Sequence, residues 1–425
     1  MDVHQRIDSL VLAPPDPPVV VEHREELIFL LRQAAELEHA IMCEYLFAAF
    51  TLKQRTDEGI TSEQLAAVDR WRKQVLEVAK QEMLHLALVQ NLLTAVGAAP
   101  YLSRPDLPSP ADYFPGVRIA LFPFGEQALR HFLYLERPEG IALDDPEAAA
   151  AVAHAEPYMD EAEIVPRRQS FGTIGHLYRA IDVGFAWLTS KLGAEKLFIG
   201  PPAAQATPEA FGWPELVPVI DLTSAHRAID TIVEQGEGVT GEWRTAHFGK
   251  FLAIFDEFMA LRVADPSFAP ARPVLVGRVR RDESNMDELP LVGDPTSARV
   301  ADLFNVVNEV ILLALTRYFA HTDESGEQLK TLSDVAVSLM FGAIKPLGQL
   351  LTQMPFGPDH PGRTAGPTFE LFYRSGYLLP HREAAWSIIA ERLRQAAEFA
   401  RASEGDPPVV TKVAGVLDRY AARLA

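Results

Sequence analysis

A carboxylate and an imidazole stand one helical turn apart on an otherwise apolar helix face. The segment is Glu82-Met-Leu-His85, and apolar residues continue its face in steps of three and four at Val75, Val78, Val89, Leu92 and Val96. This spacing is typical of the buried side of a single helix, so both ionisable groups point into a protein core. Burying either group is costly unless it is paired or bound to a metal ion. The segment therefore predicts a partner for Glu82 and His85.

A metal ion is one candidate for that partner. Helical bundles hold pairs of iron or manganese ions with glutamates and Glu-x-x-His segments that project into the core. A buried ion pair or a hydrogen-bonded core histidine explains a single motif of this length equally well. The choice depends on which other polar residues share the core.

The first predicted helix offers a second buried carboxylate. Its apolar stripe runs through Leu27, Leu31, Ala34, Ile41, Ala48 and Leu52, and Glu38 is the one charged residue on that stripe. Glu36 and His39 also have Glu-x-x-His spacing, but they lie off the stripe and rank below Glu38. Tyr45, two turns from Glu38, is a candidate to hydrogen-bond a metal ligand.

Two later segments add further candidates. Residues 232–238 read Ile-Val-Glu-Gln-Gly-Glu-Gly, in which Glu234 and Glu237 stand one turn apart and glycines end a helix. The next helix opens at His247, the head of an apolar stripe. His176 follows Gly175 in another predicted helix, off its main apolar stripe.

These segments together predict a metal site. The proposed ligands are Glu38, Glu82, His85, Glu234, Glu237 and His247, with His176 as a further candidate. Four carboxylates and two divalent cations have zero net formal charge, which suits a core of low dielectric. Oxygen and imidazole ligands favour iron, or alternatively manganese, over a thiolate-rich zinc site. The single cysteine, Cys43, excludes an iron–sulfur cluster held by four thiolates.

The bulk composition narrows the class of partner. The chain has 425 residues, 39 basic and 58 acidic, for a formal net charge of −19. Without a basic run, this charge argues against nucleic acid and against anionic membrane surfaces, and favours a small-molecule substrate or a protein partner. No secretory signal and no apolar run long enough to span a bilayer is evident, so we expect a soluble, cytoplasmic protein.

Helical patterning dominates and predicts an all-α fold, a metal-binding bundle with a helical C-terminal half packed on it. A possible short strand at Val117–Phe122 lies in a long insertion, residues 98–166. The predicted organisation is an extended N-terminal segment at 1–22, the bundle at 23–277, a linker at 278–297 and a C-terminal helical region at 298–425. We predict helices at about 23–53, 62–97, 126–135, 169–193, 221–236, 247–263, 298–321, 327–353, 381–402 and 408–424.

Read in order, several segments resemble the ferritin-like family that includes the iminophenyl-pyruvate dimer synthases of violacein, rebeccamycin and staurosporine biosynthesis. The matching segments are residues 37–40 with 45–46, 82–85, 174–178, 234–238, 247–248 and 364–369. The resemblance covers roughly residues 25–375 and implies a ferritin-like bundle with a metal site. It departs at His176, where the family is expected to have an acidic residue. Those synthases are also much longer, so this chain looks like their ferritin-like portion standing alone.

The function that follows is a metal-dependent, di-iron oxidase or oxygenase that uses dioxygen on a small amino-acid-derived metabolite. The resemblance implies a secondary metabolite and oxidative coupling of an imine of an aromatic 2-oxo acid. Two alternatives are a non-redox metal hydrolase and a non-catalytic metal-binding or scaffold bundle. The sequence leaves open a haem, a homo-oligomer and a pathway partner enzyme.

Overall fold

The computed structural model describes most of the chain beyond its N-terminal segment. The described residues are 21–109, 118–141, 143, 171–238, 243–280, 289–372, 378, 380–402 and 405–425. The extended segment predicted for residues 1–22 therefore lies outside them except for its last two residues. So do parts of the insertion at 98–166, namely 110–117, 142 and 144–166, and the middle of the linker at 278–297, and the domain division remains a prediction.

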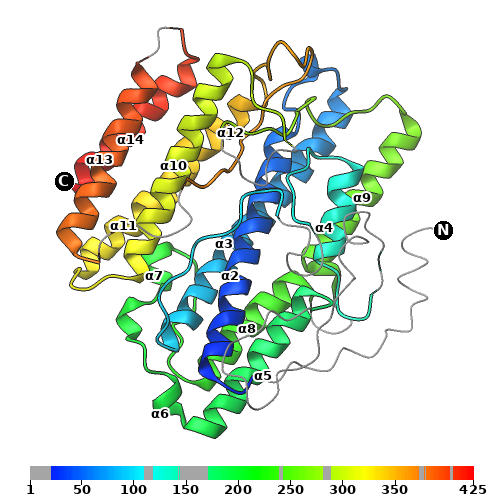
Figure 1. The fold of residues 1–425 in the computed structure, drawn as a ribbon. Helices are drawn as coiled ribbons and strands as arrows, with labels where there is room; N and C mark the ends of the chain where they lie inside the picture. The colour runs from blue at the N-terminus through cyan, green and yellow to red at the C-terminus, as the bar shows by residue number, and fades with distance from the viewer. Residues whose placement is uncertain are drawn as a thin grey trace.

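Two long helices form the centre of the molecule, and α2 packs along α3 more extensively than any other pair of elements. Figure 1 shows them in blue, with α5 and α8 beside their lower part and α4 and α9 on the right. The bundle helices are α2 (Arg24–Thr51), α3 (Ser62–Ala95), α4 (Glu126–Leu135), α5 (Ile174–Leu192), α8 (Leu222–Gly236) and α9 (His247–Ala264). Short helical turns connect them: η1 (Thr56–Glu58), α6 (Ala194–Leu197), η2 (Pro202–Ala204), α7 (Pro208–Phe211) and η3 (Trp243–Thr245).

Local sequence sets where these helices start and stop. The Thr61 hydroxyl accepts a hydrogen bond from the Gln64 amide at 3.2 Å, and the Gln64 side chain accepts one from the Thr61 amide at 2.9 Å. This reciprocal capping box fixes the first turn of α3. Helix α8 ends as the glycine pattern predicted, because Gly238 has a φ of +86° that favours glycine. Its N–H donates to the Val233 carbonyl at 3.1 Å.

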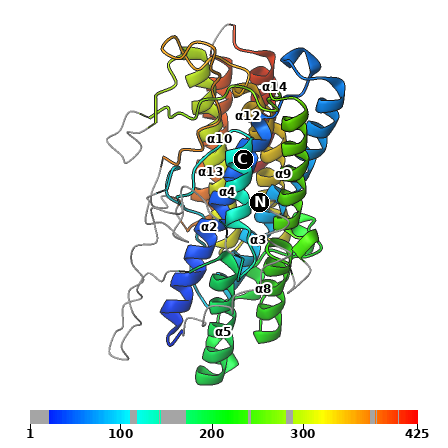
Figure 2. The same ribbon diagram turned by 90° about the vertical axis from the view of Figure 1, so that its right-hand side faces the viewer.

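The C-terminal half is also helical and packs on the bundle. Its elements are α10 (Pro295–Phe319), α11 (Gly326–Leu339), the π-helical turn η4 (Met340–Ile344), α12 (Lys345–Leu351), α13 (Arg382–Arg401) and α14 (Pro408–Leu424). Helix α12 meets α2 at Gly348, where an added Cβ would lie 2.6 Å from the Phe50 ring. Figure 2, seen from the α4 and α9 side, places α10 to α14 behind the bundle. The predicted all-α architecture is confirmed.

The strand expected at Val117–Phe122 is wrong for its described part. Residues 118–122 form no strand, and Val117 lies outside the described residues. Side chains satisfy this backbone instead of a neighbouring strand: the Ile119 amide donates to the Ser109 hydroxyl and the Ala120 amide to the Glu44 carboxylate, at 2.9 and 2.8 Å. An alternating apolar run therefore became an extended segment over α2.

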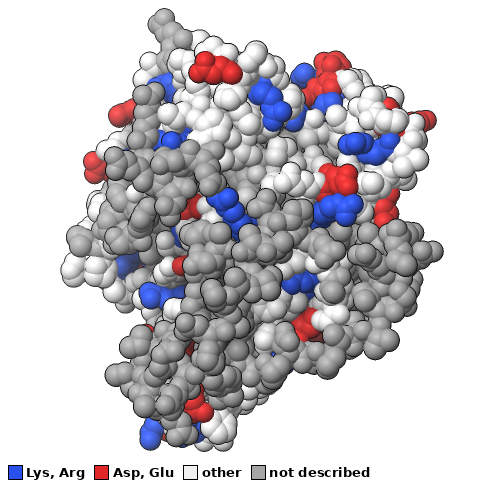
Figure 3. All heavy atoms as spheres, turned by 45° about the vertical axis from the view of Figure 1, so that its right-hand side comes forward, with Lys and Arg blue, Asp and Glu red and all other residues white. Residues whose placement is uncertain are grey.

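Among the described residues on the face in Figure 3, acidic and basic side chains are interspersed without a large patch of either sign. One described helical run, Gly326–Leu351, is long and apolar enough to cross a membrane by length and composition. Such a run is weak evidence for a span, and 44% of its apolar window is buried inside the protein.

Candidate metal centre

The carboxylate of Glu82 lies between two histidines in the core of the bundle. Its Oε2 atom is 2.8 Å from Nδ1 of His85, one turn further along α3, and its Oε1 atom is 2.8 Å from Nδ1 of His247, the first residue of α9. The two imidazole rings stack at 5.6 Å between centroids and 25° between planes. Only 1% of Glu82 is exposed. Each oxygen of one buried carboxylate thus faces a different imidazole.

A further glutamate completes the arrangement on each side. Oε2 of Glu38, on α2, is 3.5 Å from Nδ1 of His85. Oε2 of Glu136, the residue that directly follows α4, is 3.6 Å from Nδ1 of His247. Two groups of three potential metal ligands result, Glu38–Glu82–His85 and Glu82–Glu136–His247, with the potential ligand atoms of each group within 4.8 Å of one another. Glu82 belongs to both groups.

Each of the two histidines is oriented by a glutamine. Nε2 of His85 is 3.1 Å from the side-chain oxygen of Gln235 on α8, and Nε2 of His247 is 3.1 Å from that of Gln81 on α3. The glutamine oxygen accepts the Nε2 proton and turns Nδ1 toward the carboxylates. Such outer partners fix the tautomer and the ring orientation of metal-binding histidines.

Each terminal glutamate is held by a tyrosine. The Tyr178 hydroxyl donates to Oε1 of Glu38, and the Tyr45 hydroxyl donates to Oε1 of Glu136. Burial, with the adjacent carboxylates, raises the pKa of both phenols well above its ordinary value, so both remain protonated donors. The role suggested for Tyr45 by its position on α2 is therefore matched by a contact, while Tyr178 was not foreseen.

Burial and mutual attraction set the charges of the cluster. Burial raises the pKa of Glu38 to about 7. Burial alone would raise the pKa of Glu82, but His247 and His85 lower it below its ordinary value. Burial opposes the protonation of both imidazoles, yet Glu82 raises the pKa of His85 to about 10 and also raises that of His247. Without a metal ion, imidazolium protons neutralise the carboxylates.

The residues of the two groups suit a metal ion for two reasons: some of their buried polar atoms lack a regular hydrogen bond, and their oxygen and nitrogen atoms are common metal ligands. Oε2 of Glu38 is buried and makes no hydrogen bond, and Oε1 of Glu82 and Nδ1 of His247, although 2.8 Å apart, make none of regular geometry. Buried polar atoms are normally satisfied, so three on one centre indicate a missing partner. A cavity of 10 Å³, close to the size of a single water molecule, is lined by Glu38, Glu82, His85 and Glu136 of the two groups. Carboxylate oxygens and imidazole nitrogens are donors that iron and manganese accept.

The structure brings together four of the sequence-predicted ligands and leaves three apart. Glu38, Glu82, His85 and His247 converge. Glu234 is exposed at the end of α8, because the turn before the glycines places Gln235 toward His85 in its stead. The two other residues, His176 and Glu237, lie at the start of α5 and against it.

His176 and Glu237 have partners outside the two ligand groups. The His176 ring packs edge-on against Phe171 at 5.3 Å between centroids, and its Nδ1 accepts from the Gly172 amide at 3.4 Å. Glu237 lines the cavity, but its Oε1 accepts from the Gly175 amide at 2.6 Å, at the N-terminus of α5. Burial raises the pKa of Glu237 to about 8. An added Cβ on Gly175 would lie 2.3 Å from this carboxylate, so a side chain there would displace Glu237 from its present position.

Glu136 was not predicted, although the sequence held a signal for it. Leu129, Phe132 and Leu133 are buried on α4, and Glu136 continues their spacing of three and four. The helix is only ten residues long and lies in the proline-rich insertion, where the stripe is too short to single out one glutamate.

Similarity to known proteins identifies the family of this chain. A profile of the family described as ferritin-like matches residues 31–256, which is just over half of the chain. The chain belongs to the ferritin-like family. The matched ferritin-like region runs from α2 to α9 and contains all five residues of the two ligand groups. The resemblance seen in the sequence is therefore confirmed.

Two curated relatives are similar over most of this ferritin-like chain. It is 28% identical over 417 residues to "dichlorochromopyrrolate synthase" of Lentzea aerocolonigenes, covering 90% of this chain and 39% of that protein. It is 30% identical over 379 residues to "2-imino-3-(indol-3-yl)propanoate dimerase" of Chromobacterium violaceum, covering 83% of this chain and 34% of that protein. The chain thus spans well under half the length of either relative.

A solved ferritin-like protein from Caulobacter vibrioides also matches. It shares 22% identity, with a TM-score of 0.44, over 76% of this chain and 96% of that one.

Proposed function

We propose that this protein binds two metal ions, iron or alternatively manganese, and that Glu82 is shared between them. Glu38 and His85 complete one site, and Glu136 and His247 the other. The observation that carries the proposal is that the two oxygens of Glu82 face two different histidines, each at 2.8 Å. A carboxylate from each of several helices, with a Glu-x-x-His segment, is how ferritin-like bundles hold a metal pair.

The charge of the cavity supports two divalent ions rather than one. Four glutamates line the cavity: Glu38, Glu82, Glu136 and Glu237. Their four formal negative charges equal the positive charge of two divalent cations, and a neutral sum lowers the cost of burying all of them. Glu237 accepts from backbone amides and joins neither group of three, and a nearby cation would favour its ionised form although burial raises its pKa to about 8.

We propose an oxidase for a small amino-acid-derived metabolite as the activity. The names of the two relatives describe formation of a dimer from an imine of an aromatic 2-oxo acid and formation of a chromopyrrolate. Joining two such imines by one carbon–carbon bond removes two protons and two electrons, which dioxygen takes up. A bound pair of reduced metal ions supplies the redox chemistry for that transfer.

The chain's own residues position ligands and exclude water. Tyr178 and Tyr45 hold the outer oxygens of the terminal glutamates and leave the inner oxygens for a cation. Gln235 and Gln81 hold the Nε2 atoms of the two histidines and leave their Nδ1 atoms for a cation. The cavity of 10 Å³ accepts ions but no metabolite, so the substrate lies outside the ligand cage.

Anaerobic reconstitution with ferrous iron, followed by exposure to air, tests the proposal. We expect about two iron ions per chain and a transient visible absorbance band after mixing with air. Zinc as the metal retained from cells, with no response to dioxygen, would favour the hydrolase instead. A folded protein that retains no metal would leave a scaffold role and contradict the proposal.

A further inference from the structure

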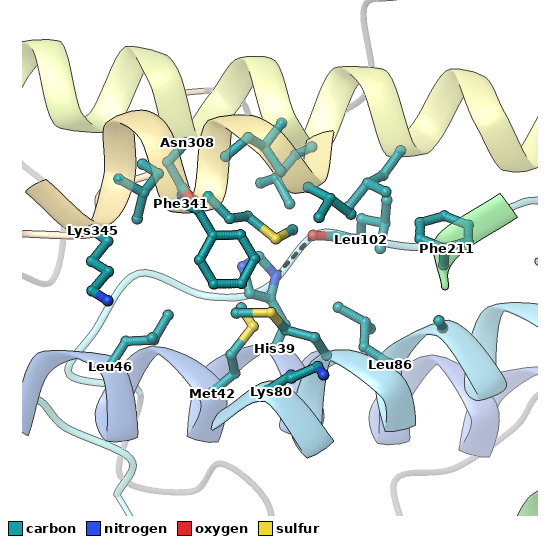
Figure 4. Close-up of a pocket in the computed structure, with 18 of the residues that line it drawn as sticks. His39, Met42, Leu46, Lys80, Leu86, Leu102, Phe211, Asn308, Phe341 and Lys345 are labelled. Atoms are coloured by element: carbon teal, nitrogen blue, oxygen red, sulfur yellow. Dashed lines mark hydrogen bonds between the residues drawn. The ribbon is translucent and has the colours of Figure 1, made fainter. Parts of the chain in front are cut away.

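A second cavity lies on the opposite side of α2 and α3 from the metal centre. It occupies 240 Å³ between these helices and α10, α11 and η4 of the C-terminal half. Its walls are largely apolar, with side chains such as Leu46, Leu86, Leu312 and Phe319. Figure 4 shows the side chains of both layers pointing into the same space. The cavity is thus larger and drier than the space among the glutamates.

The cavity contains an unused hydrogen-bond acceptor. His39, next to Glu38 on α2, is fully buried, and Figure 4 shows its ring in the cavity with Nδ1 bonded to the Leu102 carbonyl at 3.0 Å. A fully buried imidazole whose hydrogen-bond partner is a backbone carbonyl, with no acidic group bonded to it, is neutral. Nδ1 donates its proton to the carbonyl, and Nε2 therefore presents a lone pair. That nitrogen has no hydrogen-bond partner.

An unused donor faces the cavity from the other half of the molecule. The side-chain nitrogen of Asn308, on α10, is buried and makes no hydrogen bond. Only 8% of Asn308 is exposed. Leaving a buried polar group unsatisfied destabilises the protein, and a ligand that pairs with it recovers that loss. An acceptor and a donor in an apolar cavity are the convergent polar groups typical of a small-molecule site.

Two lysines add positive charge to the lining. Lys80 of α3 and Lys345 of α12 are exposed residues that line the cavity, and neither takes part in an ion pair with the described residues. Figure 4 places both ammonium groups at the edge of the apolar space. In a chain with a net charge of −19, two lysines without an ion pair among the described residues on the lining of one cavity favour a ligand with an anionic group.

The size and softness of the walls suit an aromatic body. A cavity of about 150 Å³ holds one benzene ring, so 240 Å³ has room for two fused rings. Met42, Met83 and Met340 line it, and thioethers adapt to and attract aromatic rings. Met340 begins the π-helical turn, a rare conformation that is frequent at functional sites.

We propose that this cavity is a ligand site for a small aromatic anion that carries a hydroxyl or N–H donor. The ring system occupies the apolar space, and the donor bonds to Nε2 of His39. The anionic group accepts from the Asn308 amide and pairs with Lys345, while Lys80 adds positive charge elsewhere on the lining. The site goes beyond the proposed oxidase activity and does not depend on bound metal, because no residue of the two ligand groups lines it.

Calorimetric titration of the full chain with three probes tests this assignment. The probes are 6-hydroxy-2-naphthoate, which has the donor and the anion, 2-naphthoate, which lacks the donor, and 2-naphthol, which lacks the anion. We expect 6-hydroxy-2-naphthoate to bind at least tenfold more tightly than either partial probe, since one hydrogen bond of about 1.4 kcal/mol is worth a factor of ten. Equal affinity for all three probes, or no binding of any, would overturn the proposal.

Matched variants locate the bound probe. His39→Leu is expected to weaken 6-hydroxy-2-naphthoate about tenfold and to leave 2-naphthoate unchanged. Lys345→Gln, at an exposed position that leaves the core intact, is expected to weaken both naphthoates at low salt and to spare 2-naphthol. Lys73→Gln, an exposed lysine elsewhere on α3, is the control and should change nothing. An anionic probe that binds with the same affinity to the wild type and to Lys345→Gln contradicts the site, even if His39→Leu fails to fold.

Discussion

The two cavities that share α2 and α3 have opposite character. One is a 10 Å³ space lined by glutamates and a histidine, and the other is a 240 Å³ space lined by leucines, methionines and aromatic rings. Adjacent residues of one helix serve both, because Glu38 faces the first and His39 the second. In the same way, Glu82 faces the first cavity and Met83 the second. A single helix pair is therefore the wall between a candidate metal centre and a candidate ligand site.

The unsatisfied atoms of the two cavities differ in charge, so the two cavities can bind different occupants. In the polar cavity the free oxygens belong to several acids that converge, and only a cation can satisfy like charges at one point. In the apolar cavity the free atoms are one neutral acceptor and one neutral donor set apart by apolar walls. A cation cannot bind to the donor, whereas an organic molecule can form hydrogen bonds with both the donor and the acceptor.

The largest expected effect separates the two cavities through Glu82. Glu82→Gln removes the negative charge shared by the two ligand groups, so the bound metal should fall from about two ions per chain to none. The apolar cavity should keep its affinity for 6-hydroxy-2-naphthoate. Metal analysis after gel filtration and calorimetry measure the two effects. Glu77→Gln, at an exposed position on the same helix, is the control, and metal retained by Glu82→Gln at the wild-type level would contradict the account.

A smaller effect is expected from each terminal glutamate. Glu136→Gln should abolish the site at His247 and leave the site at His85, and Glu38→Gln should do the reverse. Each variant should then retain about one ion per chain. Metal analysis tests this, and a Glu136→Gln protein with two ions would remove Glu136 from the ligand set.

The hydroxyl of Tyr178 should strengthen metal binding in the polar cavity without being essential for it. Tyr178→Phe removes the donor to Oε1 of Glu38, and the loss of such an outer partner typically lowers metal affinity by about 10- to 100-fold. Competition with a metal chelator measures the change. Tyr101→Phe, which removes a hydroxyl that donates to Glu36 away from the cluster, should leave the affinity unchanged.

The smallest effect is a dependence of metal binding on pH. The metal-free histidines are protonated at neutral pH, since Glu82 raises the pKa of His85 to about 10 and also raises that of His247. A metal ion must displace these protons, so metal affinity should increase with pH below that range. Calorimetry in buffers with different ionisation enthalpies should show proton release on metal binding. Proton uptake would contradict this arrangement of charges.

Sequence periodicity predicted the elements and residues that lie on long helix faces. Glu38, Glu82 and His85 stood on unbroken stripes of α2 and α3, and His247 headed the stripe of α9, so burial alone indicated that they converge. Glu234 and Glu237 were chosen from a helix end, where periodicity no longer says which side is buried. The glycine turn places one of them in solvent and the other against α5.

Other features depend on contacts that a local pattern does not contain. Glu136 lies just beyond a ten-residue helix, and its role depends on how α4 packs against α9. The π-helical turn at Met340–Ile344 has no sequence period of its own, so residues 326–351 read as a single helix. The apolar cavity arises where two halves of the chain meet, and His39 could be placed in it only after both halves were in view.

The most direct measurement is the anomalous scattering of iron in crystals of the iron-loaded protein. We expect two peaks on opposite sides of the Glu82 carboxylate, one beside Glu38 and His85 and one beside Glu136 and His247. Iron bound elsewhere on the chain, or a single peak that Glu82 does not contact, would contradict the claim that this carboxylate is shared by two metal ions.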